Sequence, residues 1–368
     1  MPSKTKCIGI LTSGGDCPGL NAAIRGVAKA ALGQGTKVIG IKDGFRGLVE
    51  NRMRALEDGD VSGILTHGGT FLGSSRDKPH RMPMGGKVLD MTEVAVSNAQ
   101  KNHIDCLICL GGNGTQKNAM RLHEAGLNVI TLPKTIDNDV AGTDITFGFD
   151  SSMAIATEAI DRLHTTASSH HRAIVCEIMG NKAGWLALGA GIAGGADVIL
   201  LPEIPYDMDH VVGHLLERRH HNKRFSIIAV AEGAISKQED QDGRKKKNMA
   251  SDEEIEGLIA EPVANRIARE IQQAAGIEVR YTSLGHVQRG GTPTATDRLL
   301  STRFGTKAGE LLQDGIYNVM VGLKGEHCVA VPLAEVAGLT KVIPPNHPWL
   351  KAAALVDTCL GDELNRME

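Results

Sequence analysis

Aromatic residues are scarce in this chain of 368 residues, where tryptophan, tyrosine and phenylalanine together make up 3% of the sequence. So few rings leave little for stacking on nucleic-acid bases. The chain also lacks an excess of positive charge, because 40 basic and 43 acidic side chains give a formal net charge of −3. A general nucleic-acid binder usually carries a basic surface. We therefore expect no nucleic-acid partner.

Long hydrophobic runs are absent as well. No stretch approaches the about 20 consecutive apolar residues that cross a membrane as a helix. The N-terminal Met-Pro-Ser-Lys-Thr-Lys leads directly into a predicted strand, without the apolar core of a signal peptide. We expect a cytoplasmic protein without a membrane partner.

Paired cysteines are the third feature that the sequence lacks. The number of cysteines is odd, at seven, and most of them lie inside apolar runs, as Cys176 does. This pattern predicts buried free thiols in a reducing compartment. Cys106 and Cys109 have the CxxC spacing of metal and redox motifs. However, they fall in a predicted strand, where positions three apart face opposite sides, and no second pair completes a zinc site.

Short apolar runs alternate with longer stretches of helical periodicity along the chain. The expected strands are 7–12, 37–42, 106–110, 129–132, 173–178, 198–201, 226–231 and 279–282, and the expected helices are 20–32, 94–101, 116–125, 153–166, 209–219 and 253–275. This alternation predicts an α/β fold of two doubly wound, Rossmann-like domains with largely parallel sheets. We expect one domain to comprise residues 1–148 with about 288–338, and the other 149–287 with about 339–368.

Two charged segments have ordinary structural explanations. Residues 237–252 are almost entirely polar, so we expect a solvated surface loop there. Its lysines at 245–247 fit an exposed loop tip better than a binding site. The basic run 218–224 closes a predicted helix, where cations interact favourably with the helix dipole.

Glycine, in contrast, is abundant, with 44 residues that cluster after apolar runs. Residues 13–19 follow a predicted strand and precede a helix, an arrangement in which free N–H groups and the helix dipole bind anions. Residues 68–76 end in Arg76, which could bridge phosphate oxygens. Residues 111–115 again lie between a strand and a helix. None of these is a Walker A loop or a GxGxxG motif. Together they suggest a nucleotide or polyphosphate site, with three unrelated turns as the alternative.

Thr135-Ile136-Asp137-Asn138-Asp139 follows the apolar run 129–132. On an extended chain, Asp137 and Asp139 would point to the same face. One carboxylate could accept a proton from an attacking hydroxyl while the other holds a divalent cation, which is a pattern suited to phosphoryl transfer. A polar turn after a strand is the alternative.

The second half of the chain offers groups that suit a sugar phosphate. Arg172 precedes one predicted strand, and Arg280 lies in another that is followed by the glycine-rich residues 284–291. Glu232, at the end of a strand, could accept hydrogen bonds from sugar hydroxyls. Each of these residues alone could equally be a partner in a surface ion pair.

In order and spacing, these segments resemble those of the bacterial-type 6-phosphofructokinases. The matching segments are 11–21, 68–76, 111–115, 133–139, 168–172, 179–180, 202–203 and 284–291. The resemblance implies Mg²⁺-dependent phosphoryl transfer from ATP to the 1-hydroxyl of fructose 6-phosphate, the step of glycolysis that gives fructose 1,6-bisphosphate. In this family, the arginines that match Arg172 and Arg280 reach the active site of a neighbouring subunit. A homotetramer, or a homodimer with shared sites, is therefore implied.

The resemblance also assigns roles to individual residues. Asp137 is the base, assisted by Thr135, Arg76 and Arg172, and Asp139 and Asn113 hold magnesium. The first domain binds the donor through Gly15, Arg76, Asp77, Gly112, Asn113, Gly114 and Thr115. The second binds the sugar phosphate, and the substrate residues are Thr135, Asp137, Arg172, Met179, Gly180, Asn181, Glu232, Arg280, His286 and Arg289.

The choice of phosphoryl donor depends on two positions. Pyrophosphate-dependent relatives carry aspartate at the position of Gly114, where glycine leaves room for a nucleotide, so ATP is favoured. Lys134, however, stands where lysine is typical of the pyrophosphate enzymes. A pyrophosphate-dependent fructose 6-phosphate 1-phosphotransferase therefore remains an alternative.

Further departures from the family pattern leave two more alternatives. Asn113 replaces the usual aspartate near magnesium, and Asn181 replaces the arginine found in many members. These changes would suit a sugar-phosphate-binding regulator that has lost catalysis. Another ketose phosphate, such as sedoheptulose 7-phosphate, is a second alternative for the acceptor. Asp58, His164 and His221 replace basic residues of the family's effector site, which argues against regulation by ADP or phosphoenolpyruvate.

Overall fold

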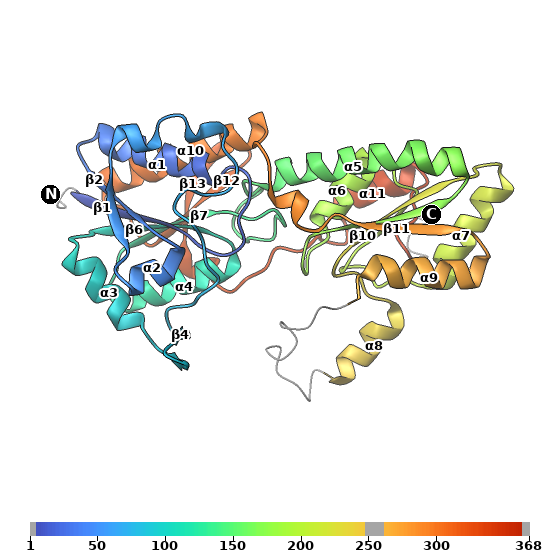
Figure 1. Ribbon diagram of the computed structural model, residues 1–368, viewed down its shortest axis with the longest axis horizontal. Helices are drawn as coiled ribbons and strands as arrows, with labels where there is room; N and C mark the ends of the chain where they lie inside the picture. Colours follow the sequence, from blue (N-terminus) through green and yellow to red (C-terminus); the bar gives the residue numbers. More distant parts are fainter. Residues whose placement is uncertain (1–4, 247–260, 363–368) are drawn as a thin grey trace. The chain divides into compact units, whose positions relative to one another are not determined.

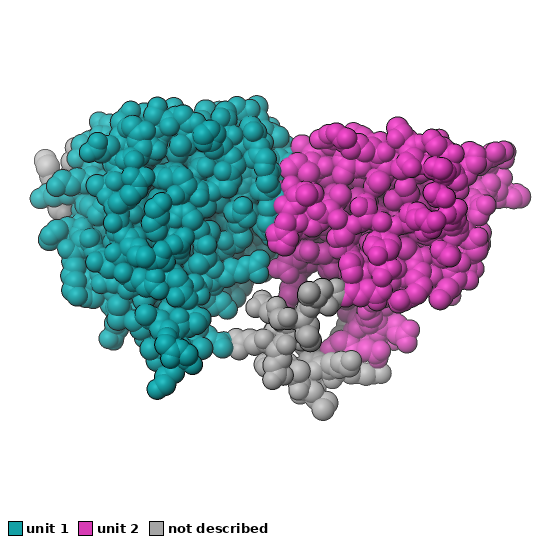
Figure 2. Space-filling view, viewed as in Figure 1, with its two compact units in different colours: residues 1–152, 289–341 teal, residues 153–288, 342–368 magenta. Residues whose placement is uncertain are grey.

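The structure, a computed structural model, describes residues 5–246 and 261–362. The chain divides into two compact units, shown in different colours in Figure 2. Unit 1 contains Met1–Ser152 and Arg289–Lys341, and unit 2 contains Met153–Gln288 and Val342–Glu368. Each unit has its own β-sheet.

Unit 1 is built on a seven-stranded sheet with the order β13-β12-β7-β6-β1-β2-β3 (Figure 1). All neighbours pair in parallel except at the two edges, where β13 and β3 run antiparallel. The strands are β1 (Cys7–Thr12), β2 (Lys37–Ile41), β3 (Met53–Leu56), β6 (Cys106–Gly111), β7 (Val129–Pro133), β12 (Val319–Lys324) and β13 (His327–Pro332), with a separate hairpin of β4 (Met82–Met84) and β5 (Lys87–Leu89).

Helices cover both faces of this sheet (Figure 1). On one face α1 packs along α10, and on the other lie α2, α3 and α4. Their bounds are α1 Leu20–Gly33, α2 Gly44–Val49, α3 Thr92–Lys101, α4 Asn113–Glu124 and α10 Ala295–Asp314, with 3₁₀ turns η1 Asp58–Val61, η2 Ile64–Thr66 and η4 Leu333–Glu335. The arrangement confirms the predicted doubly wound α/β fold.

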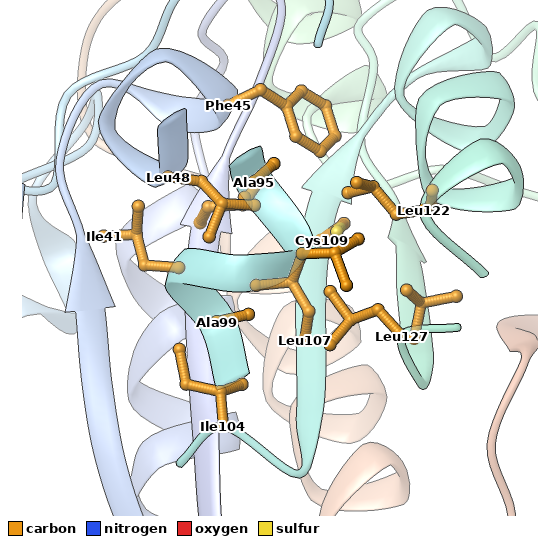
Figure 3. Packing of buried hydrophobic residues seen from close by; sticks show 14 of the residues in the cluster. Ile41, Phe45, Leu48, Ala95, Ala99, Ile104, Leu107, Cys109, Leu122 and Leu127 are labelled. Atoms are coloured by element: carbon orange, nitrogen blue, oxygen red, sulfur yellow. The ribbon is translucent and has the colours of Figure 1, made fainter. Parts of the chain in front are cut away.

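The apolar cluster of Figure 3 fixes the helices on that second face. Phe45 of α2, Ala95 of α3 and Leu122 of α4 are all fully buried against Leu107 and Cys109 of β6. The small alanine allows α3 to approach the sheet closely, and the larger side chains fill the space on either side. As a result the N-terminus of α4, which follows β6 directly, has a fixed position at the end of that strand.

Cys106 and Cys109 are both buried and both free, and Cys109 belongs to this cluster whereas Cys106 does not. All seven cysteines of the chain are free, and all except Cys328 are buried. The prediction of buried thiols is thus confirmed for six of them.

Unit 2 has a four-stranded, fully parallel sheet with the order β11-β8-β10-β9. Its strands are β8 (Ala173–Ile178), β9 (Val198–Leu200), β10 (Ser226–Ala231) and β11 (Val279–Ser283). The helices are α5 (Phe149–His170), which begins in unit 1, α6 (Trp185–Ala193), α7 (Met208–His220), α8 (Lys237–Lys246), α9 (Val263–Ala275) and α11 (Pro348–Leu355), with the 3₁₀ turn η3 at Gly285–Arg289. One face carries α5, α6 and α11 and the other α7 and α9 (Figure 1).

The predicted loop at 237–252 is wrong over its described part, because Lys237–Lys246 forms helix α8. Ser236 and Glu239 cap this helix reciprocally. The Glu239 N–H donates to Ser236 Oγ at 3.1 Å, and the Ser236 N–H donates to Glu239 Oε2 at 2.8 Å. Such a capping box starts a helix even in a polar sequence. Residues 247–252 of that prediction, and 253–260 of the predicted helix 253–275, lie outside the described residues.

No helix within the described residues has both the length and the apolar character that a membrane crossing requires.

Candidate active site

In unit 1, polar turns follow three adjacent strands at the carboxyl end of the sheet. β7, β6 and β1 are parallel neighbours, so their carboxyl ends lie together (Figure 1). The Ser13 N–H donates to the Leu110 carbonyl at 2.9 Å, and the Lys134 N–H donates to the Gly111 carbonyl at 3.1 Å. The turns that follow these strands therefore form one continuous surface, at the position where open α/β sheets bind ligands.

The glycine-rich segment 68–76 joins the same surface. The Gly14 N–H donates to the Ser75 carbonyl at 2.9 Å, and Ser74 Oγ donates to the Gly14 carbonyl at 2.6 Å. All three glycine-rich segments predicted to share a ligand are thus brought together. Arg76 is exposed beside them, whereas the carboxylate of Asp77 accepts a hydrogen bond from Arg46 Nε of α2 at 2.7 Å. That bond lowers the pKa of Asp77 and directs the carboxylate toward α2.

The N-terminus of α4 has the geometry of an anion site. Gly112 is its N-cap, and Asn113, Gly114 and Thr115 form its first turn. A β-carbon at Gly114 would meet no atom within 4 Å, so the space above this turn is open. At Gly111, in contrast, a β-carbon would collide with the side chain of Thr115, which makes glycine obligatory there. The free N–H groups and the dipole of a 12-residue helix suit a phosphate.

The aspartate segment is a turn rather than the extended chain that the sequence analysis assumed. β7 ends at Pro133, and Asn138 adopts a left-handed backbone with φ 51°. Thr135 Oγ1 accepts the Asp137 N–H at 3.1 Å, and Asp137 is buried with 9% of its surface exposed. Burial raises the pKa of Asp139, against the opposing effect of Thr135 and nearby cations.

Asn113 links α4 to this turn. Its Nδ2 donates to Asp139 Oδ2 at 2.8 Å and to the Asp139 carbonyl at 3.1 Å. Its Oδ1 is buried and has no hydrogen-bond partner. An unpaired amide oxygen next to a carboxylate is a suitable pair of ligands for Mg²⁺, which prefers oxygen. Among the described residues, no group of three or more His, Cys, Asp or Glu side chains could hold a metal, so a cation bound here would take most of its ligands from water or substrate.

Two cations converge on the turn after β1. Lys134 is 3% exposed, and its Nζ donates to the Gly15 carbonyl. Arg289 Nη1 donates to the Asp16 carbonyl at 3.1 Å. A β-carbon at Gly15 would lie only 2.8 Å from the same Nη1 atom. Burial lowers the pKa of Lys134. An anionic ligand would compensate these two positive charges, whose hydrogen bonds to this turn go to carbonyl oxygens.

In unit 2, the carboxyl ends of β8, β10 and β11 gather a second group. Glu232, after β10, accepts N–H groups from Gly180 at 3.2 Å and Asn181 at 2.8 Å, in the turn after β8. The adjacent β11 leads into η3, which contains His286. The structure thus brings the predicted Met179–Asn181 segment and Glu232 into contact, with His286 after the neighbouring strand.

Arg172 and Arg280 do not belong to this group. Arg172 precedes β8, Arg280 is the second residue of β11, and both pair with Glu278, at 2.9 Å and 2.7 Å. Both arginines lie at the end of the sheet where the strands β8 and β11 begin. A strand of six residues, such as β8, spans about 20 Å, which separates these arginines from the turn at Gly180.

Glu177 holds the segment that leads to His286, and no role was predicted for it from the sequence. Its carboxylate accepts the Ala264 N–H at 2.9 Å and Ser283 Oγ–H at 2.8 Å, and its carbonyl accepts the Leu284 N–H at 3.0 Å. It therefore anchors the chain just before His286. A single charged residue inside the apolar strand Ala-Ile-Val-Cys-Glu-Ile was the available signal.

Comparison with known proteins gives consistent matches. A sequence model of the phosphofructokinase family matches residues 7–312. An "ATP-dependent 6-phosphofructokinase" of Spirochaeta thermophila is 55% identical, covering 97% of this chain and 98% of its own. One from Propionibacterium freudenreichii subsp. shermanii is 52% identical, covering 96% and 99%. The T-state structure of Pichia pastoris phosphofructokinase matches with a TM-score of 0.79 and 34% identity, over 92% of this chain and 36% of that longer one.

The Asn113–Asp139 contact yields a first prediction. Asn113→Asp replaces the amide donor with a second carboxylate next to Asp139. Without metal, the variant should lose about 1–3 kcal/mol of stability, because a bond is replaced by repulsion. Mg²⁺ should raise its melting temperature more than that of the wild type, because the added charge strengthens cation binding.

Differential scanning calorimetry with and without MgCl₂ measures both effects. Asn128→Asp is the matched control, because the Asn128 amide also donates to an aspartate carbonyl, that of Asp105. An equal effect of Mg²⁺ on Asn113→Asp and on the wild type would rule out a cation at this position.

Proposed function

The chain belongs to the phosphofructokinase family, and we propose that it is an ATP-dependent 6-phosphofructokinase. It would transfer the terminal phosphoryl group of ATP to the 1-hydroxyl of fructose 6-phosphate. The observation that carries this proposal is the junction of α4 and the aspartate turn, where Asn113 contacts Asp139 at 2.8 Å. This junction sets a phosphate-binding helix N-terminus beside two carboxylates. As the resemblance implies, the enzyme would act in glycolysis in the cytoplasm.

The donor phosphates would lie over the first turn of α4 and the Gly15 turn. Backbone N–H groups, Lys134 and Arg289 supply the positive potential, and the exposed Arg76 is available to contact the transferred group. The open space above Gly114 supports a nucleotide as donor. Both named relatives are described as ATP-dependent.

Pyrophosphate is the second candidate donor because of Lys134. The buried ammonium group of Lys134, beside the proposed position of the donor phosphates, compensates anionic charge without occupying much space. Such a site would accept a compact donor as well as a nucleotide. The assay described below separates the two.

Asp137 would act as the general base toward the sugar hydroxyl. Its carboxylate is largely buried, and its backbone is fixed by Thr135 Oγ1, so it can accept a proton with little reorganisation. General-base assistance of this kind contributes about 10²–10⁴-fold. Asp139 and Asn113 would hold Mg²⁺, which when bound neutralises charge on the transferred phosphoryl group.

The sugar phosphate would bind the unit 2 group. Glu232 presents its carboxylate at the Gly180–Asn181 turn, where sugar hydroxyls could replace or add to the backbone donors. Arg172 and Arg280 lie at the opposite edge of the same sheet, which supports the expectation that they serve another subunit's site. We therefore expect a homotetramer, or a homodimer with shared sites.

A coupled assay of fructose 1,6-bisphosphate formation tests the function. We expect turnover with fructose 6-phosphate, ATP and Mg²⁺. Turnover with pyrophosphate alone would identify the pyrophosphate enzyme. Binding of fructose 6-phosphate without turnover on either donor would identify a regulator, the interpretation suggested by Asn113 and Asn181. Sedoheptulose 7-phosphate, tested in parallel, measures acceptor selectivity.

Substitution of the base gives a sharper test. Asp137→Ser should lower kcat by about 10²–10⁴-fold, because proton acceptance is lost, while fructose 6-phosphate still binds. Asp144→Ser, which removes an exposed carboxylate from the following loop, is the control. Steady-state kinetics and calorimetric titration measure the two effects, and a normal kcat in Asp137→Ser would refute the base assignment.

Donor choice can be tested at Gly114. Gly114→Asp should suppress ATP use, raising its KM by about tenfold or more, because a carboxylate would fill the open space and repel the phosphates. Gly213→Asp, on α7 of unit 2, is the control, since a β-carbon at that glycine would also meet no atom within 4 Å. Unchanged kinetics with ATP in Gly114→Asp would remove the argument from pocket space.

A further inference from the structure

Lys341, the last residue of unit 1, lies against the aspartate turn from the far end of the sequence. Its Nζ donates to Asn138 Oδ1 at 2.9 Å, to the Thr143 carbonyl at 3.1 Å and to the Asp144 carbonyl at 2.9 Å. An ammonium group has three donors, so each can be matched to one of these acceptors. Long charged side chains usually extend toward water. The side chain of Lys341 instead points toward the aspartate turn, where these three oxygen atoms hold its ammonium group.

The backbone of Lys341 holds the same turn. Its N–H donates to the Asp139 carbonyl at 2.7 Å, and the preceding Thr340 forms an antiparallel bridge with Val140. Both the main chain and the side chain of Lys341 are thus bonded to residues between 138 and 144. The backbone contacts of Thr340 and Lys341 therefore hold Asp139 and Val140 in a strand-like pairing, which was not predicted from the sequence.

The contact with Asn138 is the most consequential of these bonds. Asn138 stands between Asp137 and Asp139, and its φ of 51° is a left-handed conformation. Asparagine tolerates this conformation better than most residues with a β-carbon, because its short polar side chain can form local hydrogen bonds. Two donors hold that side chain here, the Thr146 N–H at 3.1 Å and Lys341 Nζ at 2.9 Å, both on Asn138 Oδ1.

We propose that Lys341 is a positioning residue for phosphoryl transfer: by holding Asn138 in its left-handed conformation it sets the direction of Asp137 and Asp139. The inference rests on the proposed function of these two carboxylates. It adds a residue about 200 positions away from them that touches neither substrate. Its effect should therefore be on the chemical step and not on the binding of either substrate.

Lys341→Met tests the inference, because methionine keeps the length of the side chain but donates no hydrogen bond. We expect kcat to fall about 10–100-fold, since a displacement of about 1 Å at reacting groups has effects of this size. KM for fructose 6-phosphate and for ATP should stay within about twofold of the wild type. Lys341→Arg, which keeps the charge and donors, should recover part of the loss.

Lys324→Met is the matched control. Lys324 also lies beside Asp144, with Nζ 3.7 Å from Oδ1, but it is 55% exposed and pairs with that carboxylate rather than with Asn138. It should keep the wild-type kcat. Hydrogen exchange of the amides at 137–140 gives a readout independent of activity, and we expect faster exchange in Lys341→Met but not in Lys324→Met.

Asn138→Gly removes the acceptor while allowing the left-handed backbone, and it serves if Lys341→Met fails to fold. It should also lower kcat, and the double variant should lose less than the sum of the two single losses, because both changes break the Lys341–Asn138 contact. A wild-type kcat in Lys341→Met, or fully additive losses in the double variant, would overturn the inference. Absence of turnover in the wild type would instead refute the proposed function.

Discussion

The in-register parallel pairing of β1, β6 and β7 is the constraint on which the candidate site depends. The carboxyl ends of parallel strands lie at the same end of a sheet, so the turn at Gly14, the start of α4 and the aspartate segment meet there. About 120 residues separate the first of these segments from the last. The fully buried side chains of β6 and the helices packed on it keep that end of the sheet rigid. A site made of main-chain N–H groups requires this rigidity, because backbone donors cannot adjust as side chains do.

The parallel sheet of unit 2 likewise brings polar groups together, but at both ends of its strands. Glu232 and the Gly180–Asn181 turn lie at the carboxyl edge, where α/β sheets bind ligands. Arg172 and Arg280 lie at the amino edge, held together by Glu278. Two arginines that share one carboxylate retain a net positive charge, and Arg280 is 57% exposed. This end of the sheet is thus suited to an external anion, as the proposal of sites shared between subunits requires.

Local pattern was sufficient to predict eight of the described strands and the glycine turns, because apolar runs and glycines report directly on burial and close approach. It did not predict the short strands β3, β4 and β5, nor β12 and β13. It failed where side chains override the backbone tendency of their neighbours. The polar segment after Ser236 is a helix because of Glu239, and the aspartate segment is a turn because Asn138 tolerates a left-handed conformation. Neither Lys341 nor Glu177 could be assigned a role, since their partners lie far away in the sequence.

The amide at position 113 shows how the site balances charge. Burial disfavours an ionised Asp139, and its pKa is raised. A hydrogen bond to the ionised form opposes this effect, and Asn113 Nδ2 supplies one without adding charge. An aspartate at 113 would attract a cation more strongly, but it would also repel a polyphosphate at α4, where the proposed function requires one. With asparagine, the buried ammonium of Lys134 and the guanidinium of Arg289 face two carboxylates instead of three. If the proposed function holds, asparagine at 113 would weaken the binding of the metal and favour the approach of the anionic donor.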